Sequence, residues 1–329
     1  MESRRSFLKK TGKSALFTSI VLAASSAYPY SLIPKRKKTA GDMVIGIIGA
    51  ENSHTIGYGK MFNTDKKFPG ISVKYVWGET EEFARNAMEK GNIPNMVSNP
   101  NDMLGKIDAL IVDHRHAKYH LEAATPFVKA GIPTFIDKPF CYRVSEGMEF
   151  LAMAREVGTP VTSFSSVRQS DATFDIKKKM KTLGEFNHIV SLGPADMNSQ
   201  YGGIFFYGVH IVEPMLFLFG ENVSRVMVTK NGKNATASLA YDDGRLATLI
   251  FNNQYSGWET FVDTKEGLIK LDSSVEERDP SRNYVEMVEM FQTGKEPRTH
   301  QSILAGVAVL QALEESVDTG DWVDVPDID

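Results

Sequence analysis

Residues 43–54 read MVIGIIGAENSH: an uninterrupted apolar run, a glycine, and then a group of polar residues. A short apolar run of this kind is typical of a strand buried on both faces of a parallel sheet. Gly49 supplies the tight turn after the strand, and Asn52 or Ser53 is placed to cap a helix that runs to about residue 63. This order of strand, glycine turn and helix predicts the first βα unit of a doubly wound fold.

The same alternation of apolar strand and helix continues as far as residue 165. The predicted strands cover residues 73–77, 109–112, 134–136 and 160–165, and the predicted helices cover residues 81–90, 119–130 and 145–157. Strands that alternate with helices favour a parallel sheet, which binds its ligand at the carboxyl ends of the strands. We therefore assign residues 42–165 to one doubly wound α/β domain.

The pattern changes after residue 165. Helices are predicted at residues 171–183 and 205–219, with a strand at residues 186–192 between them. Residues 223–271 are strand-like and carry turn signals at Asn231-Gly232 and Asp243-Gly244, which favours a mostly antiparallel sheet. Two closing helices follow at residues 284–291 and 303–317. We therefore assign residues 166–329 to a second α/β domain.

The N-terminal segment differs in composition from both domains. It begins with Ser3-Arg4-Arg5-Ser6-Phe7-Leu8, continues through a weakly apolar stretch and ends in small residues near Ala27. This layout is that of a secretory signal, and the pair of arginines resembles a twin-arginine export signal. The apolar stretch is too short for a bilayer span of roughly 20 residues. We expect residues 1–27 to be a signal peptide, residues 28–41 a tether, and the protein to be exported to the periplasm or cell envelope.

Composition limits the classes of function. The chain has 329 residues, 42% of them hydrophobic, and a formal net charge of −4. It has no basic excess that would hold a nucleic-acid backbone, and we expect no nucleic-acid partner. Its single cysteine, Cys141, excludes an intramolecular disulfide framework. We also expect no stable membrane span.

A set of short motifs, in their order and spacing, resembles the Gfo/Idh/MocA family of nicotinamide-dependent oxidoreductases. The motifs are Ile45–Gly49, His120, Ala130-Gly131, Asp137-Lys138-Pro139, Val167-Arg168, Gly202-Gly203, Gly208-Val209-His210, Phe291–Gly294, and Glu315-Ser316 with Gly320. The resemblance implies that residues 42–165 are a dinucleotide-binding Rossmann domain. It implies that residues 166–329 are an α/β domain with an open sheet, which binds substrate and forms oligomer contacts. It also implies NAD or NADP as cofactor, a carbohydrate substrate, and a homodimer or homotetramer.

The glycine loop departs from the family's fingerprint. Gly49 keeps the first glycine, but Glu51 and His54 replace the second and third. A carboxylate beside a diphosphate is repulsive unless it turns away, so the fingerprint alone is weak. The helix N-terminus at Asn52, Ser53 and His54 still offers N–H groups to a phosphate.

Further cofactor contacts are expected after the second and fourth strands. Glu79 is placed to accept hydrogen bonds from the ribose hydroxyls, which favours NAD over NADP, although it may equally be a helix cap. His114, Arg115 and His120 follow the fourth strand and match a family loop that contacts the nicotinamide end. A metal bound by His116 and His120 is the less favoured alternative, since no second ligand cluster supports it.

The resemblance implies a catalytic pair. Lys138, in the position of the family's motif lysine, is expected to contact the cofactor and to stabilise a developing alkoxide. His210 is expected to bind the substrate hydroxyl and take its proton. The family's aspartate, four residues before this histidine, is replaced by Phe206, and Glu213 is an alternative partner for His210.

Three functions remain open at this point. The first is hydride transfer between NAD(P), held tightly, and a secondary alcohol of a sugar, cyclitol or glycoside, with Arg168, Tyr201 and His210 reading the substrate. The second is glycoside cleavage through transient oxidation by bound NAD. The third is a non-catalytic binding protein of the same fold, which Glu51 and Phe206 favour and which Lys138 with His210 oppose.

Overall fold

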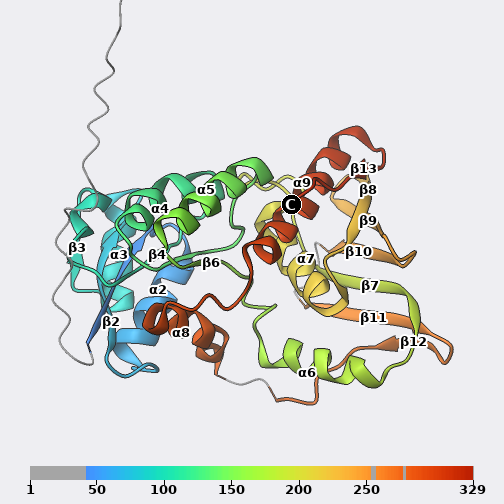
Figure 1. Cartoon of the computed structure of the whole chain (residues 1–329), viewed down its shortest axis with the longest axis horizontal. Coiled ribbons are helices and arrows are strands. Elements are labelled where there is room, and N and C mark those ends of the chain that lie inside the picture. Colours follow the sequence, from blue (N-terminus) through green and yellow to red (C-terminus); the bar gives the residue numbers. More distant parts are fainter. Residues whose placement is uncertain (1–41, 253–256, 277–278, 329) are drawn as a thin grey trace, which may run out of the picture. The chain divides into compact units, whose positions relative to one another are not determined.

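A computed structural model describes residues 42–252, 257–276 and 279–328. The predicted signal peptide and tether lie outside the described residues. The first sheet has six parallel strands in the order β3-β2-β1-β4-β5-β6 (Figure 1). This is the doubly wound order, and it confirms the predicted Rossmann sheet. The strands are β1 Met43–Ile48, β2 Ile71–Trp77, β3 Asn95–Met96, β4 Ala109–Val112, β5 Thr134–Ile136 and β6 Val161–Thr162.

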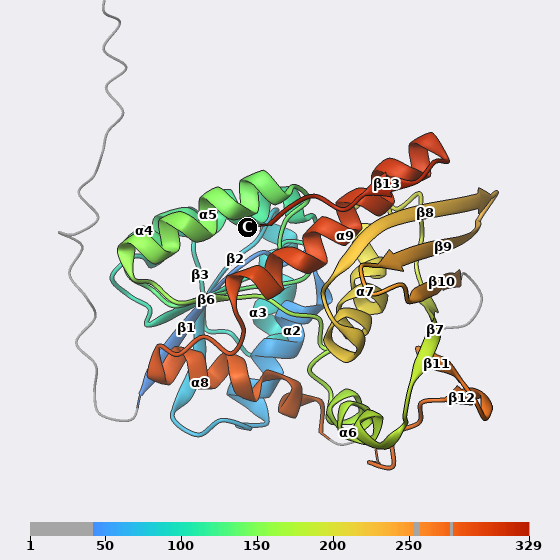
Figure 2. The same ribbon diagram turned by 45° about the vertical axis from the view of Figure 1, so that its right-hand side comes forward.

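Helices cover both faces of the first sheet (Figure 2). One hydrophobic core joins the sheet to α4 (His120–Lys129) and α5 (Val144–Val157). The other core joins it to α2 (Ser53–Gly59) and α3 (Glu81–Gly91). The Asn52 side chain caps α2 by accepting a hydrogen bond from the His54 amide, and α2 continues as a π-helical turn, Lys60–Thr64.

The turn between β1 and α2 requires a glycine. Gly49 has a φ of +110°, and a Cβ atom built on it would lie 2.5 Å from the backbone of Asp113 and His114. Backbone in this region is strained for any L-residue with a side chain. The close approach also brings the end of β1 against the end of β4, where the site described below is built.

The second sheet has seven strands in the order β12-β11-β7-β10-β9-β8-β13. Its pairs are antiparallel except β7 with β10, which is parallel, so the prediction of a mostly antiparallel sheet is confirmed. The strands are β7 Phe186–Pro194, β8 Val223–Asn231, β9 Asn234–Tyr241, β10 Leu246–Asn252, β11 Glu259–Thr264, β12 Gly267–Lys270 and β13 Val323–Asp324. The helices α6 (Asp171–Lys179) and α7 (Phe205–Phe219) precede and follow β7.

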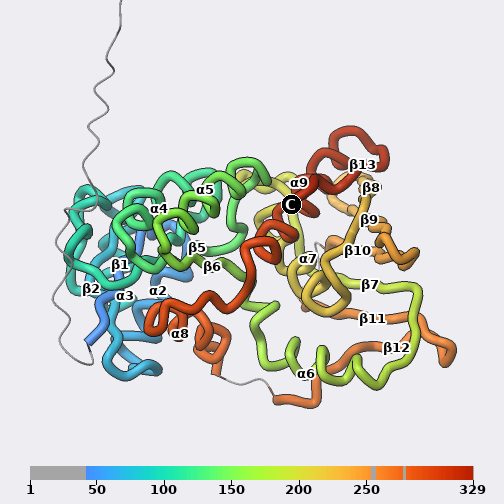
Figure 3. The backbone as a smooth tube through the Cα atoms, viewed as in Figure 1, coloured from blue at the N-terminus to red at the C-terminus, as the bar shows by residue number. Residues whose placement is uncertain are grey.

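The last two helices return to the Rossmann domain (Figure 3). Met287 and Phe291 of α8 (Val285–Thr293) pack in the core that contains α2. The long helix α9 (His300–Thr319) contributes Leu304 to the core under α5, and Leu310 to the core of the second sheet. The residues beyond 166 therefore do not pack as one separate body. Among the described helices none combines the length and apolar character needed to cross a membrane.

Candidate active site

Lys138 and His210 lie close enough for the charge of the lysine to act on the histidine. Lys138 is the second residue after β5, before a cis bond to Pro139, and only 8% of the residue is exposed. His210 comes from α7 and is also buried. Burial lowers the pKa of His210 well below its usual value, and the positive charges of Lys138 and His54 lower it further. His210 is therefore neutral, and it lies within the electric field of the Lys138 ammonium.

His210 is held by a serine that the sequence analysis did not single out. Its Nδ1 atom lies 2.7 Å from the Ser165 hydroxyl. The Glu213 carboxylate accepts a hydrogen bond from the Ser165 amide and pairs with Arg298 at 3.0 Å. Glu213 thus acts on His210 only through Ser165. No motif marks this serine, because it follows a strand of ordinary composition.

Two buried carboxylates lie beneath Lys138. The Asn52 amide donates to Asp113 at 2.9 Å and to Asp137 at 3.2 Å. His54 Nδ1 lies 3.1 Å, and Lys138 Nζ 3.7 Å, from the same oxygen of Asp137. Burial raises the pKa of Asp137, but the charges of His54 and Lys138 outweigh burial and hold it below its usual range. Asp137 is therefore the ionised member of the pair.

Asp113 is the protonated member. Burial and the charge of Asp137 raise its pKa well above the usual value. The Thr55 hydroxyl lies 2.8 Å from the Gly49 carbonyl and 2.5 Å from Asp113. A hydroxyl has a single hydrogen to donate, so both contacts are satisfied when Thr55 donates to Gly49 and Asp113 donates to Thr55.

The same cluster has the residue types of a metal site. Ligand atoms of His54, Asp113 and Asp137 lie within 4.8 Å of one another. The Asn52 amide, however, donates to both carboxylates, and His54 is bonded to Asp137. We therefore interpret the cluster as a hydrogen-bonded network and not as a metal site.

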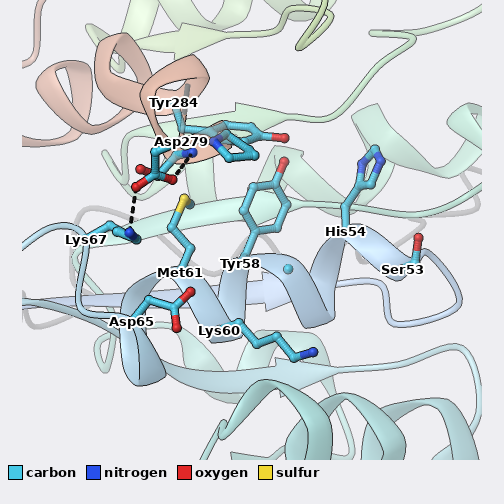
Figure 4. A pocket seen from close by; sticks show the side chains of 12 residues that line it. Ser53, His54, Tyr58, Lys60, Met61, Asp65, Lys67, Asp279 and Tyr284 are labelled. Carbon is cyan, nitrogen blue, oxygen red and sulfur yellow. Dashed lines mark hydrogen bonds and ion pairs between the residues drawn. The ribbon is translucent and has the colours of Figure 1, made fainter. Parts of the chain in front are cut away.

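His54 is the most accessible member of this network. Its side chain is 34% exposed, against 7% for Lys138. It lines a cavity of about 370 Å³ together with Tyr58 and Tyr284. Figure 4 shows His54 and Tyr58 extending from α2 while Tyr284 approaches from the segment before α8. Solvent and small molecules therefore reach His54 more readily than its buried neighbours.

Glu79 makes contacts that the sequence analysis did not predict. One carboxylate oxygen accepts hydrogen bonds from the Ala50 and Glu51 amides, both at 2.9 Å, and the other lies 2.9 Å from His114 Nδ1. Burial raises the pKa of Glu79, but these hydrogen bonds dominate and lower it to about 2. Glu79 therefore fixes the glycine loop, and the oxygen that contacts His114 keeps a further lone pair for a ribose hydroxyl.

A second cavity, of about 610 Å³, opens at the carboxyl ends of the central strands. It is lined by Ile48 at the end of β1, Trp77 at the end of β2, and His114 after β4. Glu79 and Tyr119 also line it. Aromatic side chains around a carboxylate suit the base and the ribose of an adenosine. The residues present therefore fit the adenosine half of a dinucleotide.

Tyr201 connects the second domain to the glycine loop and to the loop after β4. The Tyr201 hydroxyl donates to Glu51 at 2.7 Å. The Arg115 guanidinium lies 4.3 Å from the centre of the Tyr201 ring and 5.4 Å from that of Phe206. Tyr142 also donates to the Tyr201 carbonyl, at 2.7 Å. The Glu51 carboxylate thus has a donor outside the loop, which turns it away from the position of a diphosphate.

Two predicted ligand contacts lie elsewhere. His120 is fully buried, and its ring nitrogens lie 2.9 Å from the Pro139 carbonyl and 2.8 Å from the His114 carbonyl. It therefore orders the loops after β4 and β5 from beneath. Arg168 is also buried, and it bonds to Gln169 and stacks on Phe217. The motifs singled out both residues, but spacing along the chain does not determine which way a side chain points. Among the other predicted cofactor contacts, Ser53 is exposed at the start of α2.

Comparison with known proteins supports the fold and the family. Residues 43–164 match the GFO_IDH_MocA family, described as an oxidoreductase family with an NAD-binding Rossmann fold. An uncharacterized oxidoreductase, YhhX of Escherichia coli K12, is 27% identical over 188 residues, which are 52% of this chain and 54% of that protein. The match thus spans about half the length of this relative.

Solved structures share the fold over most of the chain. GenD2 from gentamicin A biosynthesis, in complex with NAD, has a TM-score of 0.73 at 14% identity, and the match covers 90% of this chain and 100% of that one. Myo-inositol 2-dehydrogenase from Lactobacillus plantarum has a TM-score of 0.72 at 17% identity, with 87% and 100% covered. At these identities the likeness establishes the fold alone. Residues 43–164 are therefore similar to the NAD-binding Rossmann domain of this oxidoreductase family.

Proposed function

We propose that the protein is an NAD-dependent oxidoreductase that acts on a secondary alcohol of a sugar, cyclitol or glycoside. One observation carries the proposal: Lys138, at the carboxyl end of β5, has its Nζ atom 5.6 Å from the centre of the Phe206 ring on α7, one turn before His210 on that helix. A cation and an imidazole at this place suit the oxygen of an alcohol that loses a hydride. The inositol dehydrogenase among the structural neighbours supports a polyol substrate.

Bound NAD would supply the acceptor for the hydride, and the residues of the protein would bind and orient the cofactor and the substrate. The cavity beside Glu79 takes the adenosine, and Glu51 and Glu122 add negative charge to its lining. A 2′-phosphate would be repelled by three carboxylates, so we propose NAD over NADP. The Asn52 and Ser53 amides, for which the described residues offer no hydrogen-bond acceptor, are left for the diphosphate.

We expect the cofactor to stay bound between turnovers. The Tyr201–Glu51 hydrogen bond spans the two domains beside the diphosphate position, so we expect the nucleotide to leave only when this contact opens. Denatured wild-type protein is expected to release NAD in near-stoichiometric amount, and adding myo-inositol, D-glucose or a methyl glycoside before denaturation is expected to convert it to NADH. Tyr201→Phe, which removes only the hydroxyl, is expected to lose its nucleotide during dialysis. Wild-type protein that neither holds nor binds NAD would contradict the proposed function.

We further propose that the protein is exported in folded form with its cofactor. The support is the Ser3-Arg4-Arg5-Ser6-Phe7-Leu8 sequence ahead of an apolar stretch. Replacing Arg4 and Arg5 by lysine is expected to keep the protein in the cytoplasm, because the twin-arginine route depends on that pair. Fractionation of cells followed by immunoblotting measures the distribution. Unchanged export of the double variant would reject this route.

One observation favours the non-catalytic alternative. Glu79 already bonds to two amides of the glycine loop, so a nucleotide has fewer loop donors than the fingerprint provides. The two functions separate in one measurement, because a ligand that binds the folded state raises the melting temperature. NAD that raises the melting temperature without being reduced by any alcohol would favour a binding protein.

A further inference from the structure

The hydrogen-bond partners of His210 determine which of its nitrogens carries the hydrogen. The Ser165 hydroxyl accepts a hydrogen bond from the Val167 amide at 3.2 Å and lies 2.7 Å from His210 Nδ1. Ser165 is fully buried, and among the described residues its hydroxyl hydrogen has no other acceptor within hydrogen-bond distance. A buried donor without an acceptor is costly, so Ser165 donates to Nδ1. The hydrogen of neutral His210 is then on Nε2.

This tautomer makes His210 a donor and a poor proton acceptor. Its Nε2 has no lone pair to offer, and its Nδ1 faces a hydroxyl that cannot neutralise an imidazolium. The nearby charge of Lys138 also opposes a positive charge on this ring. His210 is therefore suited to donate a hydrogen bond to a substrate oxygen.

His54 has the opposite arrangement. Its Nδ1 lies 3.1 Å from Asp137, which is ionised and can only accept, so Nδ1 carries the hydrogen. Its Nε2 then has a free lone pair, and none of the described residues bonds to that atom. The Asp137 carboxylate stabilises the imidazolium that forms when Nε2 takes a proton. Lys138 Nζ lies 3.7 Å from the same Asp137 oxygen that His54 contacts. Because Lys138 is expected to contact the oxygen of the substrate alcohol, His54 is placed close to that oxygen as well.

We propose that His54 is the proton acceptor of the reaction, with Asp137 orienting it and with Lys138 and His210 donating hydrogen bonds to the substrate oxygen. This inference rests on the proposed function. The O–H bond of the alcohol breaks and an N–H bond forms at His54 Nε2, while the hydride of the adjacent C–H bond goes to the oxidised nicotinamide. The released proton leaves His54 for water through its exposed edge.

The first test is kinetic and uses the full protein loaded with NAD. His54→Gln, which keeps a donor for Asp137, is expected to lower single-turnover reduction by an active alcohol of the panel above by roughly 10²-fold. His54→Ala is expected to be equally slow and to recover part of the rate when free imidazole is added, because the site is accessible. A lost structural contact would not respond to imidazole. His188→Gln, an exposed histidine of β7, serves as the matched control and is expected to be unchanged.

The second test does not depend on turnover. Nitrogen-15 NMR of the histidine rings in the wild-type protein is expected to show the hydrogen on Nδ1 of neutral His54 and on Nε2 of His210, assigned with the two glutamine variants His54→Gln and His210→Gln. The reverse tautomers would overturn the assignment of roles, as would a wild-type rate in His54→Gln. A wild-type protein that no alcohol reduces would instead refute the proposed function, and the NMR result would still decide how the two histidines are protonated.

Discussion

Lys138→Met is expected to lower the rate of alcohol oxidation roughly 10²–10⁴-fold while the protein still folds and binds NAD. The ammonium lies at the carboxyl end of β5 and is buried, and we expect it to stabilise negative charge that develops on the substrate oxygen in a site shielded from water. Methionine keeps most of the side-chain volume, so the change removes the charge and little packing. Single-turnover reduction of bound NAD measures the chemical step without interference from product release.

The interpretation of this variant needs two controls. Lys129→Met, at the exposed end of α4, removes an equal charge from the same domain and is expected to leave the rate unchanged. The melting temperature reports whether Asp137 tolerates the loss of Lys138, since His54 still faces that carboxylate. A Lys138→Met protein that is stable, binds NAD and turns over at the wild-type rate would show that the lysine is not part of the chemistry.

Gly49→Ala is expected to lower the free energy of unfolding by about 1–3 kcal/mol from backbone strain alone. The added Cβ would lie 2.5 Å from the Asp113 and His114 backbone, so β1 and β4 must also separate. We expect this separation to disturb the Thr55–Asp113 contact and to abolish NAD binding. Urea unfolding and the nucleotide content of the purified protein measure the two effects.

Gly57→Ala is the matched control for this change. Gly57 lies within α2, and an added Cβ there would meet nothing within 4 Å. Alanine in a helix is favoured over glycine by roughly 0.5–1 kcal/mol, so this variant is expected to be slightly more stable than the wild type. A Gly49→Ala protein as stable as wild type, with NAD bound, would contradict the requirement for glycine at the turn.

The Rossmann sheet was predictable because its strands are short apolar runs and its helices have clear ends. Residues 109–112 and 205–219 were predicted with the bounds that the structure gives them. The parallel pairing of β7 with β10 was not predicted, since strand-like segments separated by turns suggest neighbouring antiparallel pairs. The two strands are joined through α7, β8 and β9, and local sequence carries no signal for such a distant pairing.

The candidate site was predictable only in part. Lys138 and His210 were found because they stand in motifs of a family. The His54–Asp137 contact joins residues 83 positions apart. His54 stands where the fingerprint has a glycine, so the motif does not predict a functional side chain at that position. Ser165 and the position of Glu79 depend on side-chain direction, which spacing along the chain does not determine.

The helix α9 has a consequence for how the protein is made. Because this helix supplies side chains to the Rossmann core and to the core of the second sheet, neither core is complete until residue 319 has been synthesised. The N-terminal domain therefore cannot finish folding on the ribosome ahead of the rest, as consecutive domains commonly do. The part of its apolar surface that α8 and α9 cover stays exposed until these two helices have been synthesised.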